Sequence, residues 1–284
     1  MTITTSNLSD RFRVYPWLEV VNPNLQIGRI KHALFDFDGT ISVIRQGWEK
    51  IMISLMVEMI CNGKQPSTEI IEEVTDYVDR STGILTIKQM KWLEQAVIRY
   101  GYTEDKKTAV EYKRIYNERL LRPVRERIRN MDGNDTGRQN LMVMGALAFL
   151  RGLREAGVEL YLASGTDQIY VEEEAAVLGV DRFFSPHIYG AREDSEEDSK
   201  ERIIAKVIED NQLRGEEFLV VGDGPVEIAY AKQSGAIALG VASDEINRCG
   251  FNDRKRRRLI DAGADILIGD FTHWQELLNL FAQE

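Results

Sequence analysis

Cysteine is scarce in this chain of 284 residues, which contains only Cys61 and Cys249. The two lie far apart in the sequence and have no histidine cluster beside them, so we expect neither a disulfide framework nor a zinc site. Histidine is almost as rare, and His32, His187 and His273 form no cluster. Nothing in the sequence therefore suggests a Ser-His-Asp triad.

Long apolar runs are missing as well. The longest, LMVMGALAFL, is far too short to cross a bilayer, and the first residues, MTITTSNLSD, have no basic region followed by an apolar core. Lys and Arg number 36 against 46 Asp and Glu, and the net charge of -10 argues against extended binding to nucleic acid or to an anionic membrane. We therefore expect a cytoplasmic protein that acts on a small molecule, with neither nucleic acid nor membrane as a partner.

The chain does contain enough apolar sequence for a sizeable core, since 43% of its residues are hydrophobic and 29% are charged. From about residue 137 onward, short β-rich runs alternate with amphipathic stretches. The runs are VELYLAS, RFFSPHIY, EFLVVGDG, AIALGVA and ADILIGD. This alternation is typical of a parallel sheet with helices on both faces.

Residues 42–136 have a different sequence pattern. Apolar residues recur three and four positions apart, and Gly, Pro or Ser stand between the successive segments. This spacing predicts helices in GWEKIMISLMVEMICNG, PSTEIIEEVTDYVDRST, TIKQMKWLEQAVIRYG and EDKKTAVEYKRIYNERLLRPVRERIR. A segment of this length between two strands is too long for a loop. We therefore predict an α/β fold, a doubly wound parallel sheet from residues 31–41 plus 137–284, with an inserted all-helical domain at 42–136. Residues 1–30 form an N-terminal extension whose role the sequence does not indicate.

The stretch ALFDFDGT, residues 33–40, ends an apolar run with two aspartates. Asp36 and Asp38 flank Phe37, so both carboxylates point to one side if the strand geometry continues to its tip, and the phenylalanine points to the other. Two carboxylates at this spacing repel each other. They become favourable when a hard cation lies between them, or when one attacks while the other carries a proton.

Further polar residues follow the other predicted strands. Ser164 and Gly165 offer a hydroxyl and a backbone amide after the second strand, at an expected helix start, which is a natural anion site. In VVGDGPVEI, Asp223 stands at the tip of the fourth strand, and Glu227 lies one turn into a helix that starts at Pro225. Ligands of open α/β sheets bind at this carboxyl edge, so we expect these side chains to meet there.

A lysine is expected at the same edge. Lys200 begins the helical pattern SKERIIAKVIED, with Ser199 as its N-cap. Lys206 competes for the same role, but Lys200 lies nearer the helix start and is better spaced from Asp223. The constellation is thus two aspartates, a hydroxyl, an ammonium group and a further aspartate.

Taken in order, DFDGT, LASGT, Lys200 and GDGPVE resemble the four motifs of the haloacid dehalogenase-like phosphohydrolase superfamily, with a helical cap inserted after the first motif. The resemblance covers residues 31–284, and the order and spacing of all four motifs make it far more specific than a lone Asp-x-Asp. It implies a Rossmann-like core, a cap domain at 42–136 and hydrolysis of a small phosphorylated metabolite.

The resemblance implies a role for each motif residue. Asp36 is the expected nucleophile, which forms an aspartyl-phosphate, and Asp38 is the expected general acid and base. Mg2+ is the expected cofactor, held by Asp36, the backbone carbonyl of Asp38 and Asp223. Glu227 departs from the aspartate more usual at its place, and we expect it to order metal-bound water instead of binding the metal directly.

Two groups of residues are expected to contact the substrate. The phosphoryl oxygens are assigned to Ser164, the Gly165 amide and Lys200. In capped members of the superfamily the cap determines specificity. The candidates for contacts with the leaving group are Arg45, Trp48 and, within the turn STGILTIKQ at 81–89, Lys88.

Other functions on the same fold stay open. A sugar phosphomutase uses the same aspartyl-phosphate but returns the phosphate to its substrate, and Thr40, where such mutases tend to carry valine, favours hydrolysis. True haloacid dehalogenases lack the second aspartate, so Asp38 argues against that activity. A non-catalytic binding module is a further alternative, against which the intact set of acids argues.

Two basic stretches, RKRRR at 254–258 and the Lys- and Arg-rich residues 113–129, could indicate a targeting or nucleic-acid patch. Acidic residues interleave with the second stretch, and LIDAGAD continues the first. We therefore interpret both as solvated faces of helices.

Overall fold

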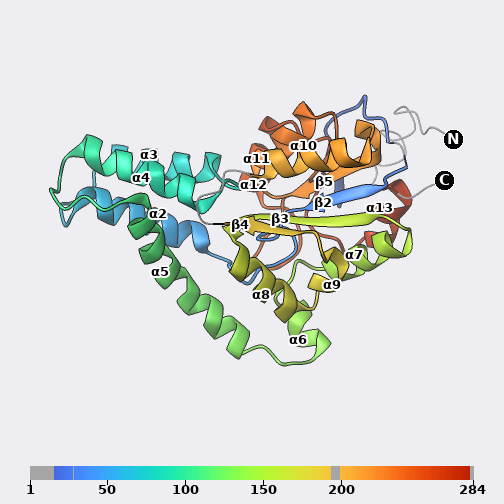
Figure 1. Cartoon of the computed structure of the whole chain (residues 1–284), viewed down its shortest axis with the longest axis horizontal. Coiled ribbons are helices and arrows are strands. Elements are labelled where there is room, and N and C mark those ends of the chain that lie inside the picture. Colours follow the sequence, from blue (N-terminus) through green and yellow to red (C-terminus); the bar gives the residue numbers. More distant parts are fainter. Residues whose placement is uncertain (1–15, 28, 193–198, 282–284) are drawn as a thin grey trace.

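A seven-stranded sheet forms the centre of the molecule (Figure 1). The computed structural model describes residues 16–27, 29–192 and 199–281. The strands lie in the order β1-β7-β6-β5-β2-β3-β4, and every neighbouring pair is parallel except β1 with β7. The strands are β1 (Leu18–Val20), β2 (His32–Phe35), β3 (Glu159–Asp167), β4 (Ile188–Ala191), β5 (Phe218–Gly222), β6 (Ile237–Val241) and β7 (Ile266–Ile268).

Helices cover both faces of this sheet (Figure 1). One layer contains α10 (Lys200–Asn211), α11 (Pro225–Gln233) and α12 (Asp253–Asp261), and the other contains α7 (Ala146–Glu155), α8 (Gln168–Leu178), α9 (Asp181–Phe184) and α13 (Trp274–Phe281). Successive residues of the central strand pack into opposite layers, since Leu34 joins the apolar cluster of Ile204 and Ile228 while Phe35 joins that of Phe149. The predicted doubly wound α/β fold is therefore confirmed.

Three local features differ from the sequence-based expectations or add to them. The run RFFSPHIY begins with the short helix α9 instead of a strand, because a short buried apolar run reads alike as helix or strand. Strand β3 continues to Asp167, so the expected helix start at Ser164 is wrong and α8 begins at Gln168. Within the N-terminal extension, β1 pairs with β7 at the edge of the sheet.

Four long helices lie together beyond the carboxyl edge of the sheet (Figure 1). They are α2 (Trp48–Cys61), α3 (Thr68–Arg80), α4 (Thr86–Tyr100) and α5 (Ala109–Arg129). Local chemistry sets their starts: the Ser67 side chain caps α3, and Thr108 with Glu111 forms a capping box on α5. Residues one turn apart, such as Ile70 and Val74, are buried. None of the helices described here is long and apolar enough to cross a membrane.

The two connections to these helices run side by side. The Val43 N–H donates to the Leu141 carbonyl and the Val143 N–H donates to the Ile41 carbonyl, both at 2.9 Å. The helices therefore leave and re-enter the core through two paired connections beside Asp38. The short α6 (Asp135–Gln139) crosses the predicted boundary at 136, so the division into domains stays a prediction. We call residues 42–136 the insertion and the rest of the described chain the core. A 3-10 turn, η2 (Gly215–Glu217), precedes β5 in the core.

Candidate active site

Asp36 follows directly after the central strand β2, beside the carboxyl end of its parallel neighbour β5, while β3 on the other side continues to Asp167. Its backbone N–H donates to the Val221 carbonyl at 2.8 Å, which continues the sheet pairing by one residue. The carboxylate is buried, and its Oδ1 accepts a hydrogen bond from Lys200 Nζ at 2.7 Å. Its Oδ2 receives only a long bond from the Thr40 hydroxyl, at 3.5 Å. One oxygen of Asp36 is thus held firmly and the other is held weakly.

Three buried carboxylates converge at this position. Asp36, Asp223 and Glu227 each offer an oxygen, and these oxygens lie within 4.8 Å of one another. Burying three like charges together is costly unless cations compensate them. Carboxylate oxygens are the ligands that Mg2+ prefers, so the donor set fits a hard divalent cation. The family resemblance assigns Asp36, the Asp38 carbonyl and Asp223 to the metal and Glu227 to its bound water, whereas the geometry brings the Glu227 carboxylate together with those of Asp36 and Asp223.

Lys200 lies at the first position of α10, where the Ser199 side chain caps the helix. Its ammonium group is buried and contacts both Asp36 and, at 3.0 Å, Glu227 Oε2. Burial lowers the pKa of Lys200, but the two acids outweigh it and raise the pKa above its ordinary value. The lysine is therefore a fixed positive charge at the site, and Lys206, its competitor in the sequence, is exposed.

Asp38 lies on the other side of the same cavity. Its Oδ2 accepts hydrogen bonds from the hydroxyls of Ser164, at 3.4 Å, and Thr166, at 3.2 Å. Its Oδ1 is buried and has no hydrogen-bond partner among the described residues, although Arg45 Nε lies 3.7 Å away. Burial raises the pKa of Asp38 to about 7, against the opposing charge of Arg45. This carboxyl is therefore suited to exchanging a proton near neutral pH.

Arg45, a predicted leaving-group contact, is occupied by a buried acid. Its guanidinium binds Glu174 of α8 in a two-pronged ion pair, with Nη2 at 2.7 Å from Oε1 and Nε at 3.0 Å from Oε2. Both side chains are about 5% exposed. The arginine therefore lines the cavity as half of a neutral pair.

These residues enclose one cavity of about 60 Å3. Its lining from the core is Asp36, Asp38, Ser164, Gly165, Thr166, Lys200 and Asp223, and its lining from the insertion is Arg45, Trp48, Thr82, Gly83, Ile84, Thr86, Gln89, Tyr116 and Leu120. The structure thus brings the predicted core residues together, with Glu227 reached through Lys200. Trp48 also lines the cavity, but Lys88 does not, and its neighbours Thr86 and Gln89 take that place.

The loop between α3 and α4 lies in close contact with the site. Gly83 has a positive φ of 96°, and a Cβ there would lie 2.5 Å from Glu227 Oε2. A Cβ on Gly165 would lie 2.2 Å from the carbonyl oxygen of Ile84. Both positions therefore need glycine, because the loop and the catalytic edge approach each other too closely for a side chain.

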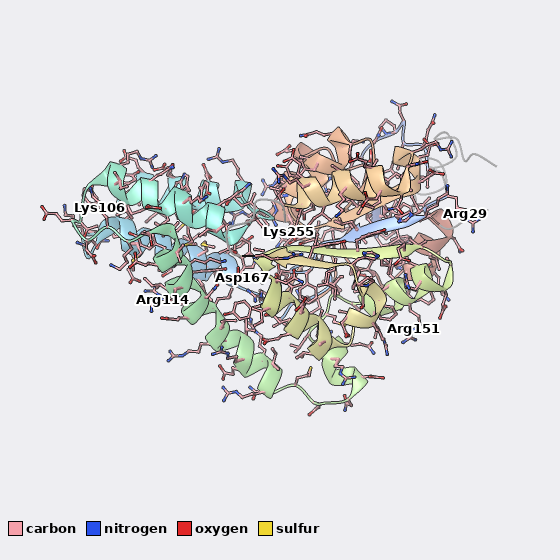
Figure 2. The ribbon with its side chains drawn as sticks, viewed as in Figure 1. Arg29, Lys106, Arg114, Arg151, Asp167 and Lys255 are labelled. Atoms are coloured by element: carbon pink, nitrogen blue, oxygen red, sulfur yellow. The ribbon has the colours of Figure 1, made fainter. Side chains whose placement is uncertain are left out.

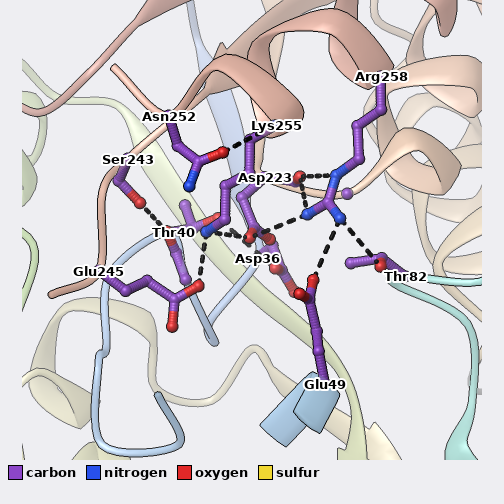
Figure 3. A network of polar contacts seen from close by, with 12 residues as sticks. Asp36, Thr40, Glu49, Thr82, Asp223, Ser243, Glu245, Asn252, Lys255 and Arg258 are labelled. Atoms are coloured by element: carbon purple, nitrogen blue, oxygen red, sulfur yellow. Dashed lines mark hydrogen bonds and ion pairs between the residues drawn. The ribbon is translucent and has the colours of Figure 1, made fainter. Parts of the chain in front are cut away.

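Two further buried cations, Lys255 and Arg258, contact Asp223 and are not among the residues predicted for the site. Lys255 Nζ lies 2.7 Å from Asp223 Oδ2 and 2.6 Å from Glu245 Oε1 (Figure 3). Burial raises the pKa of Asp223, but Lys255 and Arg258 outweigh it and lower the pKa below its usual value. The interpretation of RKRRR as a solvated face is thus wrong for these two cations. The signal was present, since Lys255, Arg258 and the buried Leu259 share one face of α12.

Arg258 joins the core to the insertion (Figure 3). Its Nη2 donates to the backbone carbonyl of Asp223 at 3.0 Å, and its Nη1 lies 3.2 Å from Glu49, 3.1 Å from Asp79 and 3.3 Å from the Thr82 hydroxyl. These partners belong to α2, α3 and the loop that carries Gly83. One buried guanidinium therefore contacts both the metal-ligand turn and the insertion.

A second link between the two parts is made at Asp167, which lies, like Lys255, where the insertion meets the core (Figure 2). The Asp167 carboxylate pairs with Lys113 of α5 and accepts a hydrogen bond from Asn117 at 3.2 Å. The insertion is therefore held against the core by charged contacts on both sides of the cavity.

Comparisons with known proteins agree with this geometry. The model of a family of hydrolases, the haloacid dehalogenase-like hydrolases, matches residues 30–235. A 5'-nucleotidase of Pseudomonas aeruginosa is 28% identical over 103 residues, which are 36% of this chain and 46% of that relative, so the match spans less than half of its length.

Solved structures of low identity share the fold. The crystal structure of a predicted phosphoglycolate phosphatase from Haemophilus somnus 129pt has a TM-score of 0.57 at 17% identity, over 88% of this chain and 98% of that one. A β-phosphoglucomutase from Clostridium difficile has a TM-score of 0.56 at 12% identity, over 89% and 97%. Together with the family match over most of its length, the motifs and the fold make this chain a member of the haloacid dehalogenase-like hydrolase family.

Proposed function

We propose that this protein is a magnesium-dependent phosphohydrolase that cleaves a small phosphate monoester, a metabolite of the cytoplasm, through an aspartyl-phosphate on Asp36. The observation that carries the proposal is the convergence of Asp36, Asp38, Lys200 and Asp223 on a single cavity. No one of these residues is diagnostic alone. Together they offer a nucleophile, a proton donor, a fixed cation and a metal ligand at one strand edge.

Asp36 is the proposed nucleophile. Lys200 holds its Oδ1, so the weakly bonded Oδ2 is the oxygen available to attack phosphorus. Attack forms the acyl-phosphate bond and breaks the bond from phosphorus to the leaving oxygen. Lys200, the Ser164 hydroxyl and the Gly165 amide are proposed to hold the phosphoryl oxygens as their charge redistributes.

Asp38 is the proposed general acid and base. The hydroxyls of Ser164 and Thr166 hold its Oδ2, which leaves Oδ1, without a hydrogen bond among the described residues, to deliver a proton to the departing alcohol. The same oxygen then takes a proton from the water that hydrolyses the aspartyl-phosphate. The alcohol and inorganic phosphate leave, and both carboxyls return to their starting states.

Asp36 and Asp223 would hold Mg2+, with the Asp38 carbonyl as the further ligand that the family resemblance implies, and Glu227 is close enough to join them or to order the bound water. When bound, this ion supplies positive charge that screens the carboxylate nucleophile from the phosphate. Lys255 and Arg258 keep Asp223 ionised, so that it is ready to accept the metal.

The insertion is the proposed cap domain and acts as a lid. The cavity lies between the core and the insertion, so movement of the insertion is the proposed way for a substrate to enter and leave. The paired connections at residues 41–43 and 141–143 are the proposed hinge.

A phosphomutase is the alternative, because a β-phosphoglucomutase shares this fold. Returning the phosphoryl group to a phosphorylated substrate creates a bisphosphate, whose second phosphate needs a cation on the insertion side. Arg45 is the cation there among the residues described as lining the cavity, and it is paired with Glu174. This observation favours water as the acceptor.

The test is hydrolysis of 4-nitrophenyl phosphate and of a sugar phosphate, each with Mg2+ and with a chelator. We expect activity with Mg2+ alone, and one phosphate released for each ester consumed. Activity that survives chelation would refute the metal assignment. An isomeric sugar phosphate with little free phosphate would favour the mutase, and no turnover of any ester would favour a binding module.

A further inference from the structure

The cavity has two halves of opposite character. The half from the core contains four ionisable side chains, Asp36, Asp38, Lys200 and Asp223. The half from the insertion contains aromatic, aliphatic and uncharged polar side chains, namely Trp48, Thr82, Ile84, Thr86, Gln89, Tyr116 and Leu120, together with Gly83 and Arg45. If the core half holds the phosphoryl group, as the proposed function requires, the insertion half surrounds the leaving group.

We infer that the leaving group is an uncharged alcohol with hydroxyl groups, such as a sugar or a nucleoside, and carries neither a carboxylate nor a second phosphate. This inference rests on the proposed function. It concerns the part of the substrate that departs, about which the catalytic motifs carry no information.

Arg45 does not supply a binding site for an anion. Its guanidinium faces Glu174 in a buried two-pronged pair and also lies 3.7 Å from Asp38 Oδ1 and 5.7 Å from the ring centre of Tyr170. Because Glu174 already neutralises its charge, Arg45 offers an anionic leaving group little net attraction.

Two other buried cations near the cavity are also paired with carboxylates. Lys200 pairs with Asp36 and Glu227, and Lys255 pairs with Asp223 and Glu245. Lys88 lies outside the lining. Within the described parts of the chain, every cation that lines the cavity therefore has a carboxylate partner, and an added negative charge on the substrate would meet more acid than base.

The insertion half does offer partners for hydroxyl groups. Gln89 is buried and donates its amide to the Ser81 hydroxyl at 3.1 Å, which leaves the amide oxygen as an acceptor. Thr82 also lines the cavity, although its hydroxyl already donates to the Val78 carbonyl at 3.2 Å. Trp48 and Tyr116 add aromatic faces, on which the apolar face of a sugar or the ring of a base can pack.

The test compares kcat/KM for phosphate esters in the presence of Mg2+, with 4-nitrophenyl phosphate as the reference for the chemical step. Glucose 6-phosphate and adenosine 5'-monophosphate have uncharged leaving groups and distinguish a sugar from a nucleoside. 2-Phosphoglycolate, phosphoserine and fructose 1,6-bisphosphate have charged ones. We expect at least one ester of the first set to exceed all of the second by about tenfold or more. A charged leaving group that is equal or better would overturn the inference.

A second measurement separates this inference from the proposed function. The Asp36→Asn variant is titrated calorimetrically with the same esters and Mg2+, so that leaving-group preference is read without turnover. If the wild type hydrolyses nothing, the proposed function fails, while the order of the dissociation constants still decides the inference. Tighter binding of the charged esters would contradict it.

A charge variant probes the insertion half directly. Gln89→Arg places a cation without an acidic partner at the cavity wall, and we expect kcat/KM for 2-phosphoglycolate to rise about tenfold relative to that for the uncharged esters. Lys88→Gln changes the charge one residue away, outside the lining, and should leave the ratio unchanged. If Lys88→Gln changes the ratio of the kcat/KM values and Gln89→Arg does not, the assignment of Gln89 to the cavity wall would be overturned.

Discussion

The core and the insertion contribute different chemistry to one cavity. Asp36, Asp38, Lys200 and Asp223 come from strand ends or helix starts of the core, whereas the insertion presents mostly uncharged side chains. The core residues are fixed by hydrogen bonds to backbone and to one another. The loop between α3 and α4, which brings Thr82, Gly83 and Ile84 to the cavity, bears no charged group. In the proposed function, reaction chemistry and substrate choice are therefore carried by different parts of the molecule.

This division has a physical origin. Parallel strands end at a common edge, so residues that are distant in sequence meet there without any contact specific to the substrate. A bundle of amphipathic helices fixes its own apolar faces but leaves its connecting loops free to vary. Predictions can test the division by changing one part and measuring what happens to the other.

The largest effect is expected in the core. Asp36→Asn removes the attacking oxygen and a proposed metal ligand together, so we expect kcat to fall on the order of a thousandfold or more, measured with 4-nitrophenyl phosphate and Mg2+. The exposed Asp132→Asn carries the same charge change away from the cavity and should keep full activity. Activity retained in the Asp36 variant would mean that the core does not supply the nucleophile.

The next largest effect is expected on folding stability, at Arg258, which contacts both the core and the insertion. Arg258→Met leaves the acids Glu49 and Asp79 without their buried partner, so we expect the free energy of unfolding in urea to drop by about 3 kcal/mol. Arg257→Met removes the same charge from the exposed side of the same helix and should change stability by less than about 0.5 kcal/mol. Equal losses would show that Arg258 is not a structural joint.

How far the sequence predicts the structure also differs between the two parts. For the core, the fold and the gathering of Asp36, Ser164, Lys200 and Asp223 at one edge follow from strand patterns and from the motif order. The chemistry assigned to these residues stays a prediction. Glu227 shows the limit, because its place among the metal-competent acids depends on how α11 packs, not on the helix pattern.

For the insertion, the sequence predicts helices but not what their loops touch. Lys88 is the predicted leaving-group contact within 81–89, yet Gln89 lines the cavity instead, because tertiary packing sets which side of the first turn of α4 faces the core. The same reason hid Lys255 and Arg258. Five adjacent cations indicate a solvated face by composition, and this outweighs the weaker signal that Lys255 and Arg258 share a helical face with the apolar Leu259.

A smaller effect is expected where the insertion loop meets the site. Gly83→Ala must move the loop, since its Cβ would collide with Glu227, and we expect kcat/KM to fall about tenfold. Gly63→Ala is the matched control. It has a similar positive φ of 80° in the insertion but open space around its Cβ, so it carries the same backbone strain without the collision. If both variants lose activity equally, strain in the insertion and not contact with the core explains the result.

The smallest expected effect is on the pH dependence of the free energy of unfolding. It is tested by comparing an acid buried in the core with an exposed acid of the insertion. Lys31, with the backbone and side chain of Arg214, lowers the pKa of Glu217 to about 2, and Arg119 lowers the pKa of Glu58. A lowered pKa in the folded state means stability that is present above the unfolded-state pKa and is lost as the pH falls through the folded one.

For Glu217 this window runs from about pH 4.5 down to about pH 2, and because Lys31 is half exposed we expect a loss of only about 1 kcal/mol across it. Urea unfolding near pH 6 and near pH 3 measures the loss, and Glu217→Gln should reduce the dependence on pH in this range. Glu58→Gln should change it less, because its ion pair is screened by water at the surface of the insertion. A larger change from the Glu58 variant would mean that the stability of the insertion, and not that of the core, limits the protein in acid.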